Sequence, residues 1–384
     1  MTRRRTAVVS IRLLALTLIA SGMAFAAGCT SLPVSGPQAA NLSATAVTRV
    51  APAAPWCVNP TDSRIAMGDN GLQLVEPATG IKTRLAPPSP SALAWSPDGK
   101  RLAAALPGGD STTLSIFSRQ GESIAKAPVP GRVTRIEWVS PADLVALGVG
   151  TRRFSFGDAI TAILYRWDGT AAPQATTLFE TTVKPLTIRQ WGERVITSIS
   201  MTISPERDEM LYTRLHDPPA FSPYLRIILR NLDSGAERDV ATVPLSSGGG
   251  RFVGTGERIV YGDGSSSKLM EPWSDKVVQT FPVPGKQLSA SPAGKYLLLD
   301  GHLYQGETEI ASFPPTTEGK FAPGGELYLH HGMDIYRIGG LTESIPAPLP
   351  PTVAERLRTL RAWRSEGLIT DREYRENRER IMVP

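Results

Sequence analysis

The feature that most constrains this chain is a short strand–turn–strand pattern that recurs along most of its length. Its clearest copies are Leu93–Ala105 and Leu288–Leu299, each with an apolar run, a Ser-Pro turn, a glycine and a second apolar run. Proline presets the backbone of a turn and glycine accepts positive φ, so the pattern predicts two strands joined by a tight turn. Looser copies lie at residues 59–67, 136–147, 201–212, 252–260 and 321–329.

The spacing of these copies predicts the architecture. About seven units of about 40 residues match the length of a four-stranded β-propeller blade. Residues 57–348 are also rich in Gly and Pro with few helix formers, which favours an all-β domain. The alternative, a two-sheet sandwich or split barrel, does not account for a turn that recurs at this spacing. We therefore expect an all-β propeller of about seven four-stranded blades, followed by a short α-helical hairpin.

The turn Ser96–Lys100, with sequence Ser-Pro-Asp-Gly-Lys, resembles the TolB-like (PD40 or WD40-like) β-propeller repeats of bacterial envelope proteins. The match is good at Ser291–Lys295 and loose in the other copies. This resemblance implies a propeller that binds partners in the cell envelope. The α/β domain that precedes the propeller in TolB has no counterpart in the pattern here, which weakens any transfer of that protein's assembly role or partners.

The first 28 residues have the layout of an export signal. Arg3, Arg4, Arg5 and Arg12 precede an uncharged run from Leu13 to Cys29, which is too short to cross a bilayer as a helix. The run ends in Ala26, Ala27, Gly28 and Cys29, which resembles the lipobox of bacterial lipoproteins. The resemblance implies cleavage before Cys29 and lipid, such as palmitate, on that cysteine. Residues 29–56 are small and almost uncharged, so we expect a flexible tether there.

A second interpretation of this end remains open. Ala24-Phe25-Ala26 is itself an A-x-A cleavage site, which would release a soluble protein. Cys29 and Cys57 would then be free to form a disulfide in an oxidising compartment. Under the lipoprotein interpretation, Cys57 is the one remaining thiol and is expected to be a small buried apolar side chain.

The C-terminal segment 352–384 predicts a helical hairpin. Leu357, Leu360 and Trp363 have the spacing of one helical face, and Thr370 with Glu373 forms a capping box for a second helix. The pattern resembles the SHOCT short C-terminal domain, which implies oligomerisation or partner contact. A hairpin this short must cover something to be stable. The expected contact residues are Leu357, Leu360, Trp363, Leu368, Ile369 and Tyr374.

Charge and motifs exclude several classes of protein. The formal charge of +5 includes four arginines in the signal segment, which leaves +1 for the rest of the chain and argues against nucleic-acid binding. No nucleophile elbow, P-loop or dinucleotide fingerprint is present. The four histidines lack metal-ligand spacing, and adjacent His330 and His331 should point to opposite faces of a strand. The sequence therefore predicts no catalytic residue, no metal and no cofactor.

These observations favour a non-enzymatic binding or scaffold lipoprotein. The lipid on Cys29 would fix it to the periplasmic face of the outer membrane or to the outer face of the plasma membrane. The propeller would bind a protein or envelope polymer, and the tail would contact an envelope protein or a second copy. The alternative is a propeller hydrolase or lyase acting on envelope saccharides or peptides, because a site assembled from several blades leaves no linear motif.

Overall fold

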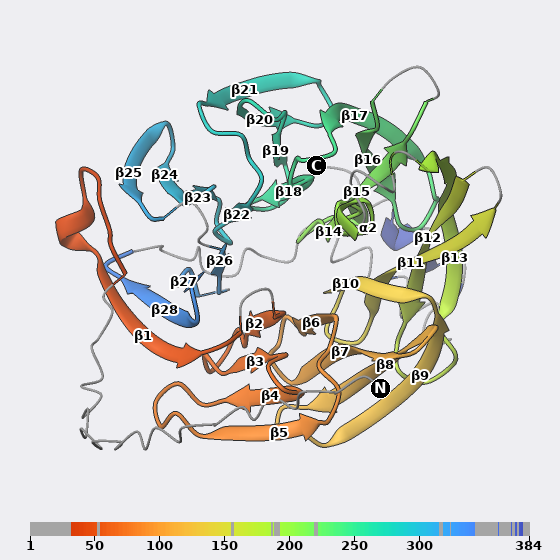
Figure 1. Cartoon of the computed structure of the whole chain (residues 1–384), viewed down its shortest axis with the longest axis horizontal. Helices are drawn as coiled ribbons and strands as arrows, with labels where there is room; N and C mark the ends of the chain where they lie inside the picture. Colours follow the sequence, from red (N-terminus) through yellow and green to blue (C-terminus); the bar gives the residue numbers. More distant parts are fainter. Residues whose placement is uncertain are drawn as a thin grey trace, which may run out of the picture. The chain divides into compact units, whose positions relative to one another are not determined.

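The computed structural model describes residues 32–341 except 52–53, 155–156, 186, 188–192, 219–221, 315–317 and 323, together with residues 360, 370, 373–374 and 376–378. All of them belong to one compact unit, Ser31–Pro384. Seven four-stranded antiparallel sheets form seven propeller blades in this unit (Figure 1). The predicted all-β fold and blade number are confirmed, and the sandwich alternative is wrong.

The first strand of each blade lies against the first strand of the next blade, so these strands surround the axis of the ring. They are β2 (Trp56–Val58), β6 (Ala92–Trp95), β10 (Arg132–Trp138), β14 (Met201–Ile203), β18 (Gly250–Val253), β22 (Leu288–Ala290) and β26 (Glu318–Phe321). The second strands are β3 (Ile65–Met67), β7 (Arg101–Gly108), β11 (Leu144–Phe154), β15 (Glu209–His216), β19 (Arg258–Gly262), β23 (Tyr296–Leu299) and β27 (Leu327–His331). Each sequence copy of the repeat corresponds to one first strand, its turn and the second strand that follows.

The two remaining strands of each blade extend outward. The third strands are β4 (Leu72–Val75), β8 (Ser111–Ser118), β12 (Gly157–Trp167), β16 (Tyr224–Asn231), β20 (Ser267–Glu271), β24 (His302–Gln305) and β28 (Asp334–Gly339). The outer strands are β5 (Lys82–Ala86), β9 (Ser123–Pro130), β13 (Gln174–Val183), β17 (Glu237–Pro244), β21 (Lys276–Phe281), β25 (Thr308–Ser312) and β1 (Ser43–Arg49). We number the blades 1 to 7 in the order of their first strands.

The repeated turn is held by side-chain hydrogen bonds. In blade 2, Ser96 Oγ donates to Asp98 Oδ1 at 2.7 Å and accepts from the Arg101 amide at 2.9 Å. The Lys100 amide donates to the same Asp98 oxygen at 3.1 Å. Gly99 has φ +67°, which a residue with a side chain rarely adopts. The Ser, Asp and Gly of the motif are therefore present for the geometry of the turn.

The core lies between the blades. On β7 of blade 2, Leu102 and Ala104 pack with blade 1, whereas Ala103 and Ala105 pack with blade 3. Successive side chains of a strand point to opposite faces, so a strand buried on both sides needs an unbroken apolar run. The run Leu102–Leu106 meets this need.

Blade 7 is closed by the N-terminal side of the chain. Strand β1 pairs antiparallel with β28, with Ser43 opposite Gly339 and Arg49 opposite Asp334. Upstream, Ser35 and Ser312 exchange backbone hydrogen bonds of 3.0 and 2.7 Å, and Leu32 is buried in a cluster with β25. The predicted tether over 29–56 is therefore wrong for residues 32–50, and the propeller begins well before residue 57. Strand β1 buries none of its side chains fully and mainly completes a ladder, while Ala44 and Val47 pack against the core.

The helical content is small. A 3-10 turn, η1 (Ala39–Asn41), precedes β1, and the short helix α2 (Glu193–Thr197) lies between blades 3 and 4. In the tail, the Thr370 amide donates to Glu373 Oε2 at 2.8 Å and the Glu373 amide donates to Thr370 Oγ1 at 3.3 Å. The predicted capping box is thus confirmed. Among the helices that the structure describes, none is long and apolar enough to cross a membrane.

Candidate functional site

A cavity of about 1050 Å³ lies along the central channel, and residues from all seven blades line it. Most of the lining residues lie in a first strand or in the segment just before one, so the cavity runs along the inner strands. Helix α2 contributes Arg194 and Thr197 to the wall. The ring of short inner strands therefore encloses a space large enough for a small molecule or a chain end.

Basic side chains predominate in this wall. They are Arg135, Arg194, Arg251, Lys286 and Lys320, against the acidic Glu137 and Glu318, an excess of three formal positive charges. Side chains two positions apart on a β-strand point to the same face. Arg135 and Glu137 have this spacing on β10, and Glu318 and Lys320 have it on β26. The near-neutral chain thus concentrates positive charge in its channel.

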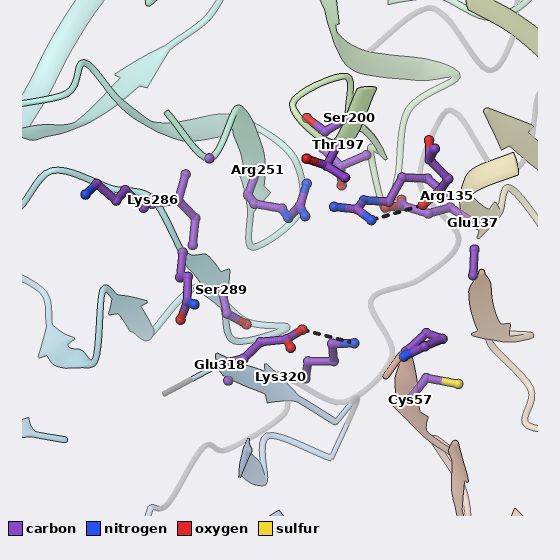
Figure 2. A pocket seen from close by; sticks show the side chains of 18 of the residues that line it. Cys57, Arg135, Glu137, Thr197, Ser200, Arg251, Lys286, Ser289, Glu318 and Lys320 are labelled. Atoms are coloured by element: carbon purple, nitrogen blue, oxygen red, sulfur yellow. Dashed lines mark hydrogen bonds and ion pairs between the residues drawn. The ribbon is translucent and has the colours of Figure 1, made fainter. Parts of the chain in front are cut away.

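Arg135 and Arg251 lie on the same side of the channel and direct their guanidinium groups toward each other (Figure 2). Arg135 Nη1 donates to the Thr134 carbonyl at 3.0 Å, and Arg251 Nη1 donates to the Gly250 carbonyl at 3.2 Å. Desolvation by the channel wall lowers the pKa of Arg135 and the positive charge of Arg251 lowers it further, while the charges of Glu318 and Glu137 act in the opposite direction. Two like charges are therefore held near each other in the channel, although the Arg135 side chain keeps contact with solvent.

Glu137 is the carboxylate associated with this arginine pair. Its Oε2 accepts a hydrogen bond of 2.7 Å from the Ile203 amide of blade 4. Burial raises the pKa of Glu137, while the charges of Arg251 and Arg135 and the Ile203 amide act in the opposite direction. The half-buried carboxylate of Glu137 therefore accepts a hydrogen bond from a backbone amide and lies in the field of two guanidinium groups without an ion pair to either.

Glu318 and Lys320 form a second charged group at the blade 7 side of the channel. Lys320 Nζ lies 3.4 Å from Glu318 Oε1, donates to the Trp56 carbonyl, and lies 4.6 Å from the centroid of the Trp56 ring. Burial acts to raise the pKa of Glu318, but the charge of Lys320 and hydrogen bonds from Lys320 and Trp56 together lower it. The hydrogen bond from Lys320 to the Trp56 carbonyl joins the first strands of blades 7 and 1 at the closure of the ring.

Cys57 lies in the channel wall as a free thiol. Burial raises its pKa to about 12, which leaves little thiolate at neutral pH and makes it a poor nucleophile. Cys29, its predicted alternative disulfide partner, lies outside the described residues, as do Ala26, Ala27 and Gly28.

The tail residues predicted to contact a partner are only partly described. Leu360 is buried, with 3% of its surface exposed, and Tyr374 is half-buried. Leu357, Trp363, Leu368 and Ile369 lie outside the described residues.

The histidines are dispersed. His216 stacks on Tyr224 at 5.3 Å between ring centroids, and His302 Nδ1 lies 3.0 Å from Glu309 Oε1. On β27, His330 is buried and His331 is partly exposed, which confirms that they occupy opposite faces. Among the described residues, no group of three or more His, Cys, Asp or Glu side chains is placed to hold a metal ion.

The charged channel residues were not among the site residues predicted from the sequence. A signal was present, because Arg135-Ile136-Glu137 and Glu318-Gly319-Lys320 place charges at alternate positions of the strand before a repeated turn. In an inner strand, such positions face either the core or the channel, and a charged pair there indicates the channel.

Comparison with known proteins supports the fold and goes no further. No family model matches the chain, and no curated protein matches it in sequence. The crystal structure of the Cps50 (Swd1) β-propeller domain of Myceliophteria thermophila matches with a TM-score of 0.50 and 13% sequence identity, covering 78% of this chain and 99% of that one. At this identity the likeness concerns the backbone alone. The chain is therefore similar to WD40-like proteins in fold, as a seven-bladed β-propeller.

Proposed function

We propose that this protein is a lipid-anchored extracytoplasmic binding or scaffold protein. The observation that carries the binding role is the channel cavity of about 1050 Å³, which all seven blades line with charged and polar side chains. A pocket with a few convergent charged groups on a rigid frame is suited to recognition. The propeller would bind a protein or envelope polymer, and the C-terminal hairpin would contact an envelope protein or a second copy.

The sequence of the N-terminal segment supports the anchor. Four arginines, an uncharged run and Ala26-Ala27-Gly28-Cys29 form the layout of a lipoprotein signal. The protein would lie on the periplasmic face of the outer membrane or on the outer face of the plasma membrane. The Cys29→Ala variant should lose palmitate labelling and leave the membrane fraction. Cys57→Ala is the matched control and should keep both, and equal retention of the two variants after a high-salt wash would overturn the anchor.

The role of the tail is tested by crosslinked pull-down of the membrane-anchored protein beside a version ending at Pro350. We expect partners or self-contacts to be lost on truncation, because the expected contact residues lie beyond that point. An unchanged set of partners would assign recognition to the propeller and contradict the proposed role of the tail. Recovery of no partner by either version would contradict the scaffold proposal.

One observation favours the alternative, a propeller enzyme acting on envelope saccharides or peptides. Glu137 and Glu318 both line the channel, and they differ in environment because the pKa of Glu137 is raised and that of Glu318 is lowered. Carboxyl groups whose pKa values differ in this way can divide the roles of acid and base. Turnover of a saccharide or peptide that Glu137→Gln abolishes and the exposed control Glu257→Gln retains would favour the enzyme over the scaffold.

A further inference from the structure

The arginine pair in the channel has an unusual balance of charge. Arg135 comes from blade 3 and Arg251 from blade 5, on either side of the first strand of blade 4. Neither guanidinium forms an ion pair within the part of the chain that the structure describes, and each makes one hydrogen bond, to a backbone carbonyl of its own strand. A guanidinium has five N–H donors, so most of the donors of this pair are left for water or a ligand.

The neighbouring carboxylate does not neutralise the pair. Glu137 carries at most one negative charge, and its Oε2 is already engaged by the Ile203 amide. Glu318, whose charge also acts on Arg135, is paired with Lys320. Lys286 and Arg194 add positive charge to the same cavity. Two guanidinium groups that face each other repel, and an anion bound between them would remove this repulsion.

We propose that Arg135 and Arg251 bind an oxyanion, the carboxylate or phosphate group of a ligand that enters the central channel. Guanidinium groups bind both kinds of oxyanion through paired N–H donors, which gives direction as well as attraction. Two such groups from opposite sides would hold one anion between them. The size of the cavity leaves room for the remainder of a small molecule or for the end of a chain.

The proposal deepens the binding role proposed above and rests on it. It names the chemistry that the channel selects: ligands with a terminal carboxylate or phosphate are favoured over neutral saccharides or cationic peptides. Near Glu318 and Lys320 the charges of the wall are paired, so the arginine pair is where selection should occur.

The test uses purified full-length protein with phosphate and, separately, citrate as probes, at ionic strength held constant with sodium chloride. We expect either or both probes to raise the melting temperature of the wild type and to give a saturable binding isotherm in calorimetry. Arg251→Gln and Arg135→Gln should each weaken binding about tenfold or more, because a charge-assisted pair is removed. The probe that binds more tightly shows whether phosphate or carboxylate is the preferred group.

Arg258→Gln is the matched control, since Arg258 lies in the same blade as Arg251 but is exposed and outside the cavity. It should bind both probes as the wild type does. Circular dichroism in the absence of the anion checks that each variant is folded. The Arg251→Lys variant tests whether binding requires the planar guanidinium group or only a positive charge. Absence of binding by the wild type, or equal binding by Arg251→Gln and Arg135→Gln, would overturn the proposal. If the pull-down still recovered partners, the scaffold role would stand without this anion site.

Discussion

Blades 2 and 7 have the same topology but are assembled from the chain in different ways. Blade 2 is continuous, with all four strands between Ala92 and Pro130. Blade 7 takes three strands from Glu318–Gly339 and its outer strand from Ser43–Arg49. A continuous blade forms by local pairing, whereas the closing blade requires the two ends of the propeller to meet first. Closure of the ring is therefore the step with the greatest cost in chain entropy, and β1 makes it possible.

The largest expected effect is removal of the closing strand. A chain that starts at Val50 lacks β1 and leaves the edge of β28 unpaired, and it should melt about 10 °C or more below a chain that starts at Leu42. The shorter chain should also self-associate, because an open strand edge can pair with another molecule. Thermal unfolding and size-exclusion chromatography measure both effects. Equal melting temperatures would mean that the ring is closed without β1.

Equivalent core residues in the two blades provide the second test. Leu102 on β7 and Leu329 on β27 are both fully buried in second strands. Truncation of either to alanine leaves a cavity and should lower the free energy of unfolding by about 2–5 kcal/mol, measured by urea titration. A loss below about 1 kcal/mol for Leu329→Ala alone would show that blade 7 opens before the rest of the ring.

The same comparison explains what the sequence could reveal. Blade 2 carries the complete turn motif and a five-residue apolar run, so the residues themselves indicate strand, turn and strand. Strand β1 has the sequence Ser-Ala-Thr-Ala-Val-Thr-Arg and buries none of these side chains fully. An outer strand is held mainly by its backbone ladder to β28, and that interaction has no hydrophobic signature. For this reason, the composition of β1 predicts a tether although the segment forms a strand.

The charged residues of the channel wall could not be predicted from the sequence for a related reason. Arg135 and Arg251 are 116 positions apart and come together only because the blades form a ring. The repeat predicts the ring, and the ring implies a channel, but the charges at its wall differ from blade to blade. A site assembled across blades can be found only after the fold has placed each first strand around one axis.

The turns between first and second strands also join neighbouring blades. Asn59 Nδ2 of blade 1 donates to the Gly99 carbonyl of blade 2 at 2.9 Å, and a Cβ on Gly99 would lie 2.6 Å from Asn59 Oδ1. Gly99→Ala should therefore cost about 2–3 kcal/mol, from positive φ and from crowding together. Gly80→Ala is the control, with φ +69° and nothing within 4 Å, and should cost less, about 1–2 kcal/mol. Equal losses in chemical denaturation would contradict the contact between blades.

The smallest expected effect is a difference in acid sensitivity between the turns that join the first and second strands of blades 2 and 7. In blade 2, burial acts to raise the pKa of Asp98, but hydrogen bonds from Ser96 and the Lys100 amide, with the nearby charges of Lys100 and Arg101, lower it below its ordinary value. A carboxyl whose pKa is lower in the folded protein adds stability above its unfolded pKa, near 4, and this stability is lost as the pH falls through the folded value. The turn of blade 7 begins at Ala322 and ends at Glu326 without this Ser–Asp pair.

Asp98→Asn should consequently lower the free energy of unfolding by about 0.5–1 kcal/mol at pH 7, and the difference from wild type should begin to shrink as the pH falls below about 4. Urea titrations at pH 7, 5 and 3 measure it. Asp110→Asn is the control, because Asp110 lies at an exposed hairpin end of the same blade, and its substitution should change little at any of these pH values. A penalty for Asp98→Asn that was as large at pH 3 as at pH 7 would mean that the side chain acts through shape rather than charge. The Ser-Pro-Asp-Gly turn of blade 2 would then be no more acid-sensitive than the turn of blade 7.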